Sequence, residues 1–116
     1  MSEWVPVLKA ADLNDGTMKM VNVRGQELLI AQVGNAYYAA DNRCPHMRGI
    51  LSQGKLTGTI VTCPKHGSQF DLKDGHVVRW TSWSGFVVAL AKVVKSPHPI
   101  KTYSVKSDGG QIMVEI

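Results

Sequence analysis

Two short stretches, Cys44-Pro45-His46 and Cys63-Pro64-Lys65-His66, decide the fold of this chain. They contain both cysteines of the protein and two of its four histidines, and sixteen residues separate them. Thiolate sulfur and imidazole nitrogen are donors that iron and zinc accept readily. The pattern therefore predicts a metal centre held by two loops. Its four ligands would be Cys44, His46, Cys63 and His66.

The gap of one residue between Cys44 and His46 is too short for both side chains to bind one ion without strain. Zinc sites usually place two or more residues between paired ligands, so a Cys2His2 zinc site is the weaker alternative. Two sulfide-bridged irons remove the difficulty, because each loop can send one side chain to each iron. Two thiolates then balance the +2 charge of the oxidised core, and a neutral centre accepts an electron more easily than a dianion with four thiolates.

The residues around these stretches resemble the soluble Rieske-type ferredoxins, which carry electrons for bacterial ring-hydroxylating dioxygenases and related oxygenases. The similarity covers nearly the whole chain, including residues 51–54, 63–71, 74–75 and 101–106. It implies an all-β Rieske fold of stacked antiparallel sheets, with one [2Fe–2S] cluster per chain. It places the cluster in a small subdomain at about residues 42–72, between a first cluster loop (residues 43–50) and a second cluster loop (residues 62–68).

The same resemblance implies a one-electron carrier that is not itself an enzyme. Its partners would be a reductase, which supplies electrons, and an oxygenase or similar acceptor, which receives them. Two alternatives remain at this point. One is a Rieske subunit of another redox system, such as a nitrite-reductase-like small subunit or a redox sensor. The other is a zinc-binding interaction domain.

Departures from the family pattern narrow the expected properties. Rieske proteins of cytochrome bc-type complexes carry a disulfide between the two loops, but the matching positions here are Gly49 and Lys65. High-potential members use a serine and a tyrosine as hydrogen-bond donors to the cluster and to cysteine sulfur. Here Ser68 is kept, as an expected cofactor-binding residue, whereas Phe70 replaces the tyrosine. Such donors stabilise the added electron, so we expect a low-to-intermediate potential.

Charge near the ligands predicts the kind of partner. Arg43, Arg48 and Lys65 flank the ligands, and no acidic residue lies between positions 42 and 65. A basic rim would steer the protein toward an acidic docking face. The net charge of +4 is moderate, and the aromatic residues, 7% of the chain, do not alternate with a Lys/Arg block. We therefore do not expect nucleic-acid binding.

The length of 116 residues fits one domain, residues 1–116, and a hydrophobic content of 44% can form a core. The first ten residues do not form a signal peptide, and no apolar run reaches the roughly 18–20 residues of a membrane span. Two cysteines in a chain of this kind favour metal ligands in a reducing compartment, so we expect a cytoplasmic protein.

Alternating apolar residues and turn signals predict short strands throughout the chain. We expect them at residues 4–9, 17–23, 26–33, 36–40, 59–62, 68–72, 76–80, 100–106 and 112–116, with a loop over residues 51–56. One segment has helical periodicity instead. Its large apolar residues, at positions 83, 86, 87, 90, 93 and 94, would span about 120° of a helix surface. This pattern predicts one inserted amphipathic helix near residues 83–95.

Overall fold

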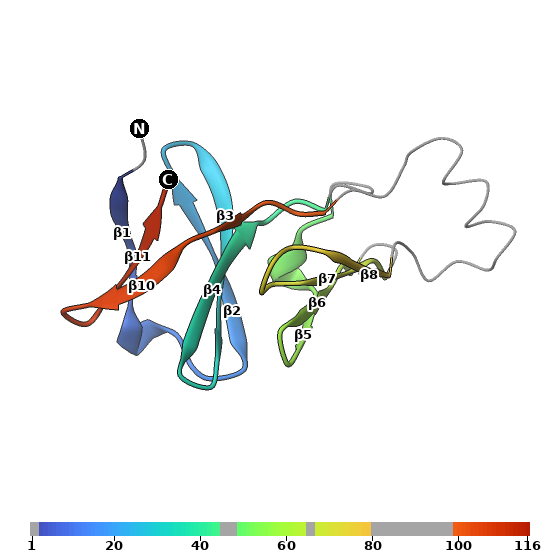
Figure 1. Cartoon of the computed structure of the whole chain (residues 1–116), viewed down its shortest axis with the longest axis horizontal. Helices are drawn as coiled ribbons and strands as arrows, with labels where there is room; N and C mark the ends of the chain where they lie inside the picture. The colour runs from blue at the N-terminus through green and yellow to red at the C-terminus, as the bar shows by residue number, and fades with distance from the viewer. Residues whose placement is uncertain (1–2, 45–48, 65–66, 80–98) are drawn as a thin grey trace, which may run out of the picture.

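The computed structural model of the chain describes residues 3–44, 49–64, 67–79 and 99–116. Figure 1 shows that these residues form β-strands joined by turns. The strands are β1 (Trp4–Lys9), β2 (Thr17–Val23), β3 (Gln26–Val33), β4 (Ala36–Asp41), β5 (Lys55–Thr57), β6 (Ile60–Thr62), β7 (Gln69–Asp71), β8 (Val77–Arg79), β9 (Thr102–Tyr103), β10 (Val105–Asp108) and β11 (Gln111–Glu115). Two 3₁₀ turns, η1 (Ala10–Asp12) and η2 (Leu51–Gln53), complete the elements. No helix of this described part is long and apolar enough to cross a membrane.

The strands form three antiparallel sheets, which follow one another along the long axis of the molecule (Figure 1). The first sheet has the order β1-β11-β10, the second β2-β3-β4-β9 and the third β5-β6-β7-β8. In the first sheet β1 pairs with β11, from Trp4 opposite Glu115 to Lys9 opposite Gln111. The third sheet is a simple meander of neighbouring strands. The predicted all-β fold of stacked antiparallel sheets is confirmed.

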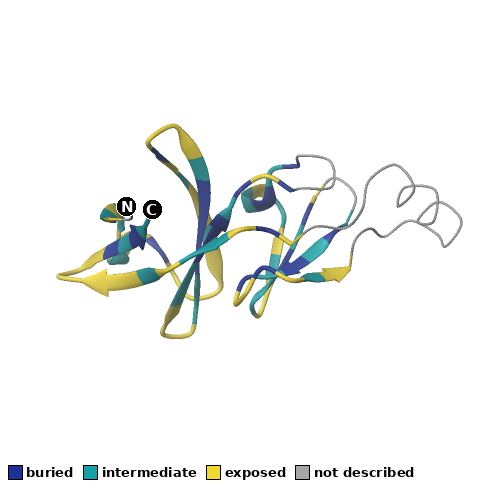
Figure 2. Ribbon diagram, turned by 45° about the horizontal axis from the view of Figure 1, so that its top comes forward, coloured by how far each residue is buried: buried dark blue, intermediate teal, exposed yellow. Residues whose placement is uncertain are grey.

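The second sheet is the middle layer, because β3 is buried on both of its faces. Successive side chains of a strand point to opposite faces. Leu28 and Ile30 belong to a core shared with the first sheet, whereas Leu29 and Ala31 belong to a core shared with the third. Figure 2 shows buried residues in the middle sheet and in the third sheet beside it. The third sheet, which carries the second cluster loop, is therefore fixed to the rest of the molecule by apolar packing.

Most predicted strands lie where we expected them, with ends that differ by one or two residues. The predicted loop at residues 51–56 is wrong in part, because Lys55–Thr57 forms β5, which pairs with β6. The predicted strand at residues 100–106 is divided. Thr102–Tyr103 pairs with β4, and after Ser104 the chain passes to the first sheet as β10. The helix predicted near residues 83–95 lies outside the described residues.

Candidate iron–sulfur centre

Each cluster loop contains one cysteine, and an equivalent backbone hydrogen bond from that cysteine closes each loop. The N–H of Cys44 donates to the carbonyl oxygen of Gly49 at 2.8 Å, and the N–H of Cys63 donates to that of Ser68 at 2.7 Å. In both cases the acceptor lies five residues further along the chain. The loops therefore have matching ends, although their sequences differ. The expected ligands His46 and His66 belong to these loops but lie outside the described residues.

Both cysteines are buried at one interface. Cys44 is 1% exposed and Cys63 is 2% exposed, and they belong to the same apolar core, between the second and third sheets. A thiolate in such surroundings is unfavourable unless a cation or hydrogen-bond donors compensate its charge. Iron in a sulfide-bridged cluster supplies that compensation, and thiolate is its preferred ligand. The buried pair of cysteines thus fits an iron–sulfur centre.

The segment that follows the first cluster loop comes very close to the second cluster loop at Gly54. A Cβ atom at this position would lie 1.9 Å from the backbone oxygen of Thr62 and 3.0 Å from Cδ of Pro64. Gly54 follows η2, which comes directly after the first cluster loop. Thr62 and Pro64 flank Cys63 in the second cluster loop. Only a residue without a side chain lets these two backbone segments come so close. Gly54 therefore permits the close spacing of the two cysteine-bearing segments.

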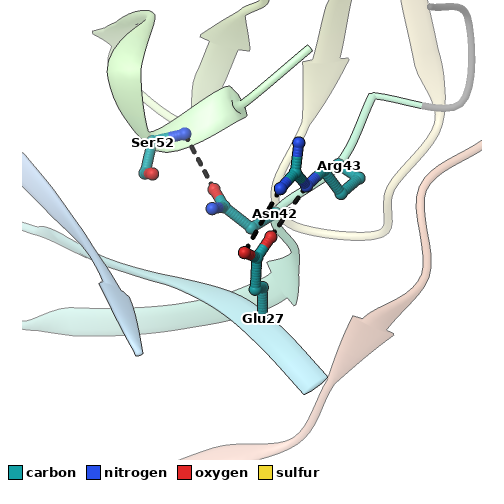
Figure 3. Close-up of polar contacts among 4 residues, drawn as sticks. All are labelled: Glu27, Asn42, Arg43 and Ser52. Atoms are coloured by element: carbon teal, nitrogen blue, oxygen red, sulfur yellow. Dashed lines mark hydrogen bonds and ion pairs between the residues drawn. The ribbon is translucent and has the colours of Figure 1, made fainter. Parts of the chain in front are cut away.

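The base of the first cluster loop is tied to its surroundings by polar contacts (Figure 3). Asn42, which is 1% exposed, accepts a hydrogen bond from the backbone N–H of Ser52 through Oδ1, at 2.8 Å. The guanidinium of Arg43 donates to both carboxylate oxygens of Glu27, with Nε at 2.7 Å and Nη2 at 3.3 Å. The backbone of Arg43 forms an antiparallel bridge with Ile50. These contacts hold the residues that precede Cys44 against β3 and η2.

The ion pair with Glu27 changes what Arg43 contributes to the surface. The hydrogen bond from the guanidinium to the Glu27 carboxylate, together with the negative charge of that group, raises the pKa of Arg43. The cation of Arg43 is thus compensated by an acid from β3, a partner that the local sequence does not reveal. Glu27 therefore partly offsets the charge that Arg43 adds to the basic rim predicted from Arg43, Arg48 and Lys65. Arg48 and Lys65 themselves lie outside the described residues.

A second polar group joins β9 to the start of the first cluster loop. The hydroxyl of Tyr103 donates to Oδ1 of Asp41 at 2.6 Å and accepts a hydrogen bond from Nε2 of Gln26 at 3.3 Å. Burial and the Asp41 carboxylate raise the pKa of Tyr103 to about 12. Asp41 is the last residue of β4, three residues before Cys44. The hydroxyl therefore anchors the C-terminal part of the chain beside the centre.

Replacing Tyr103 with phenylalanine should lower the free energy of unfolding at neutral pH by about 1 kcal/mol, because the Asp41 carboxylate loses its donor. The pKa of Tyr103 is higher in the folded state than its ordinary value of 10. Its contribution is therefore complete below pH 10 and is lost as the pH rises toward 12. Urea unfolding at pH 8 and at pH 11.5 tests this expectation. An equal difference between wild type and Tyr103→Phe at both pH values would contradict it.

The second cluster loop has its own contacts on the third sheet. Ser68 and Phe70 are completely buried. The Nε–H of Arg79, at the end of β8, donates to the carbonyl oxygen of Gly67 at 3.1 Å. Glu27, Gly54 and Arg79 were not identified from the sequence as site residues. Their roles depend on contacts between distant segments, and only the glycine of the Leu51-Ser52-Gln53-Gly54 run offered a local indication.

Two further histidines, His76 and His98, lie outside the two cluster loops. His76 is exposed, and its Nδ1 contacts Oδ1 of Asp74 at 2.5 Å. Its backbone N–H also donates to the same carboxylate, at 3.0 Å. These hydrogen bonds lower the pKa of Asp74. The contacts describe a local turn that leads into β8. His98 lies outside the described residues.

Sequence comparisons with known proteins agree with an iron–sulfur centre at this site. The Rieske [2Fe-2S] domain matches residues 3–104. The ferredoxin component of the naphthalene 1,2-dioxygenase system of Pseudomonas aeruginosa is 30% identical over 114 residues, which cover 98% of this chain and 96% of that protein. Because these matches extend over nearly the whole chain, they set aside a zinc-binding interaction domain as the alternative.

Solved structures agree with the fold. The ferredoxin of carbazole 1,9a-dioxygenase from Nocardioides aromaticivorans IC177 has a TM-score of 0.79 and 25% identity, covering 96% of this chain and 95% of that one. A chain in a complex of reduced oxygenase and oxidised ferredoxin in carbazole 1,9a-dioxygenase has a TM-score of 0.76 and 28% identity, with coverage of 96% and 91%. The chain described here belongs to the Rieske [2Fe-2S] family, as an electron carrier of the ferredoxin type that uses a Rieske iron–sulfur cluster and is not itself an enzyme.

Proposed function

We propose that this protein accepts single electrons from a reductase and passes them to the oxygenase of a multicomponent dioxygenase system. The observation that carries the proposal is the buried pair of cysteines, each near the start of a loop closed by an equivalent hydrogen bond. The full-length similarity to a dioxygenase ferredoxin component supports the assignment of partners. A cytoplasmic location is part of the proposal, because thiolate ligands persist in a reducing compartment.

We assign the cluster ligands as two cysteines on one iron and two histidines on the other. One cluster is proposed for each chain, within a single domain of residues 1–116. When bound, the cluster supplies a centre that takes up and releases one electron. The chain's own contribution is to fix the loop ends, keep water from the buried sulfur atoms and present the histidine-bearing loops to partners. The ligands are Cys44, His46, Cys63 and His66.

The cluster-binding subdomain is proposed to comprise residues 42–72. This range contains both loops, η2 and the strands β5, β6 and β7. Its buried residues Leu51, Val61 and Phe70 pack in the same core as the two cysteines. Packing of that core against Leu29 and Ala31 of β3 gives the subdomain a rigid support. A rigid frame suits electron transfer, because little rearrangement is then needed when the charge of the centre changes.

Two substitutions, one at the end of the second cluster loop and one in β7, should move the reduction potential in opposite directions. Ser68→Ala is expected to lower it, because a hydroxyl donor toward the reduced centre is removed. Phe70→Tyr is expected to raise it, because a hydroxyl is added beside the buried cysteine pair. Both side chains are completely buried, so solvent cannot replace either group. Protein-film voltammetry measures both shifts, and an unchanged potential in both variants would contradict the assignment of this environment.

Reconstitution tests the function itself. The purified protein is mixed with the reductase and oxygenase components of a naphthalene dioxygenase system, and product formation is followed with and without it. We expect turnover that depends on the added protein and that disappears in Cys63→Ser. If the protein can be reduced and reoxidised chemically but supports no turnover in the mixture of reductase and oxygenase, the proposed partners are wrong and electron transfer by the protein still stands.

A further inference from the structure

One row of side chains crosses the third sheet at the base of the second cluster loop. The strands pair Lys55 with Thr62, Thr62 with Gln69, and Gln69 with Arg79. Directly opposite residues of antiparallel strands point their side chains to the same face. The four side chains therefore lie next to one another. We call these residues the basic row: Lys55, Thr62, Gln69 and Arg79.

The basic row lies on the face of the sheet that is turned away from the core. The adjacent row faces the core, where Val61 and Phe70 are completely buried. Lys55 and Arg79 are exposed, and the two residues between them are half-buried. Thr62 directly precedes Cys63, and Gln69 directly follows Ser68. The two middle residues of the row are therefore paired at the two ends of the second cluster loop. The row is consequently both accessible at its two ends and adjacent in sequence to a proposed ligand.

A β-bulge places Arg79 in this row. Phe70 is paired with Val77, whereas Gln69 is paired with Arg79, so Val78 is an extra residue in β8. In a regular register Val78 would face Gln69, and Arg79 would point toward the core. Bulges reorient side chains in this way and are frequent near functional sites. The reoriented Arg79 donates its Nε–H to the carbonyl oxygen of Gly67 at 3.1 Å, which brings its charge to the second cluster loop.

The charges of the basic row are not compensated within the described part of the chain. The ion pairs formed there are Arg24–Glu3, Arg43–Glu27 and His76–Asp74. The middle of the row satisfies its own polar groups, because Nε2 of Gln69 donates to Oγ1 of Thr62 at 3.2 Å. Asp71 lies on the same face but two residues further from the loop, and its Oδ1 accepts the N–H of Lys73. The end of the face nearest the loop is therefore positive.

We propose that the basic row is a docking contact for an acidic surface of the oxygenase that accepts the electron. This inference rests on the proposed function and specifies the side from which the partner approaches the second cluster loop. Opposite charges on the two proteins would increase the rate of encounter and align the partner over the loop. In the step that follows, the reduced protein loses one electron and the acceptor gains one. The basic row replaces Arg43, which Glu27 compensates, as the source of the steering charge.

Electron transfer to small oxidants of opposite charge tests the location of this positive field. The probes are hexacyanoferrate(III), an anion, and tris(phenanthroline)cobalt(III), a cation, mixed with the reduced holoprotein in a stopped-flow instrument. At low salt, Lys55→Gln and Arg79→Gln should each slow oxidation by the anion by about two- to five-fold and should not slow oxidation by the cation. Lys19→Gln is the matched control, because it removes the same charge from an exposed position of β2.

Two further variants separate charge from structure. Arg79→Lys keeps the charge and should retain most of the rate with the anion, whereas Lys55→Gln leaves the hydrogen bond between Arg79 and Gly67 intact. Binding of fluorescein-labelled poly-L-glutamate, measured by anisotropy, provides an acidic polypeptide probe. We expect Lys55→Gln and Arg79→Gln to weaken this binding several-fold more than Lys19→Gln does.

The outcomes are distinct. If both variants behave like Lys19→Gln with every probe while wild type transfers electrons, the docking proposal is overturned and the proposed function stands. Unchanged rates together with lower melting temperatures would show that the row packs against other residues of the chain, which also overturns the proposal. If wild type contains no iron and reduces neither oxidant, both the proposed function and the docking contact fail.

Discussion

Replacing His66 with alanine is expected to leave a protein without its iron–sulfur cluster. The iron bound by the two histidines loses one of its imidazole ligands, and the methyl group of alanine cannot replace that ligand. Iron and acid-labile sulfide should fall from about two of each per chain to nearly none. The visible absorption of the cluster should disappear with them. The fold of the first two sheets should persist, since they share a core that does not include the cysteines. Far-UV circular dichroism measures that persistence.

The histidines of this chain provide the matched control. His76→Ala removes an imidazole that is exposed and contacts Asp74 in a turn before β8. We expect this variant to keep its full iron content and its absorption spectrum. His46→Ala should behave like His66→Ala. A protein that keeps two irons per chain after either loop histidine is replaced would show that the ligand assignment is wrong.

Replacing Gly54 with alanine is expected to destabilise the protein by about 3 kcal/mol, at the upper end of the usual range for overpacking. The added Cβ would lie 1.9 Å from the backbone oxygen of Thr62, so one of the two loop segments must move. The contact is with backbone, which cannot rotate away as a flexible side chain could. Because Thr62 precedes Cys63, the displacement should also change the visible spectrum of the bound cluster. Chemical denaturation and absorption spectroscopy measure the two effects.

Gly58→Ala is the control for this substitution. Gly58 lies in the turn between β5 and β6 with φ +58°, and a Cβ there would meet no atom within 4 Å. The left-handed backbone should cost about 1–2 kcal/mol without moving either cysteine. We expect an unchanged cluster spectrum in this variant. If Gly54→Ala has the same stability and spectrum as Gly58→Ala, the two loop segments are not held by the close approach at Gly54.

The parts of the fold that were predicted from the sequence depend on local patterns. The hairpin from β3 to β4 is an example, since Gly34 and Asn35 form its two-residue turn between Val33 and Ala36. Gly34 has φ +62°, which suits a tight hairpin turn. The strand β5 was missed because it has only three residues and a single apolar side chain, Leu56. Its alternation is too short to distinguish it from a loop.

The residues of the site likewise fall into two groups: those that a local sequence pattern identifies and those that depend on contacts between distant segments. The spacing of the cysteines and histidines is a local pattern, so the sequence alone identifies the two loops. It does not identify the residues that contact them. Glu27 reaches Arg43 only because β3 lies beside the end of β4, and Arg79 reaches Gly67 only because a bulge turns it outward. Such contacts depend on strand register, which one sequence does not specify without the three-dimensional arrangement.

A redox titration of the purified protein, followed by electron paramagnetic resonance, tests the central claim most directly. Ligation by two cysteines and two histidines predicts a rhombic signal that appears on reduction. The midpoint should fall between about −150 and +300 mV, in the lower part of that range, because Phe70 replaces a tyrosine donor. A colourless protein that contains zinc would contradict the account, and so would a midpoint near −400 mV, which is typical of clusters with four cysteine ligands.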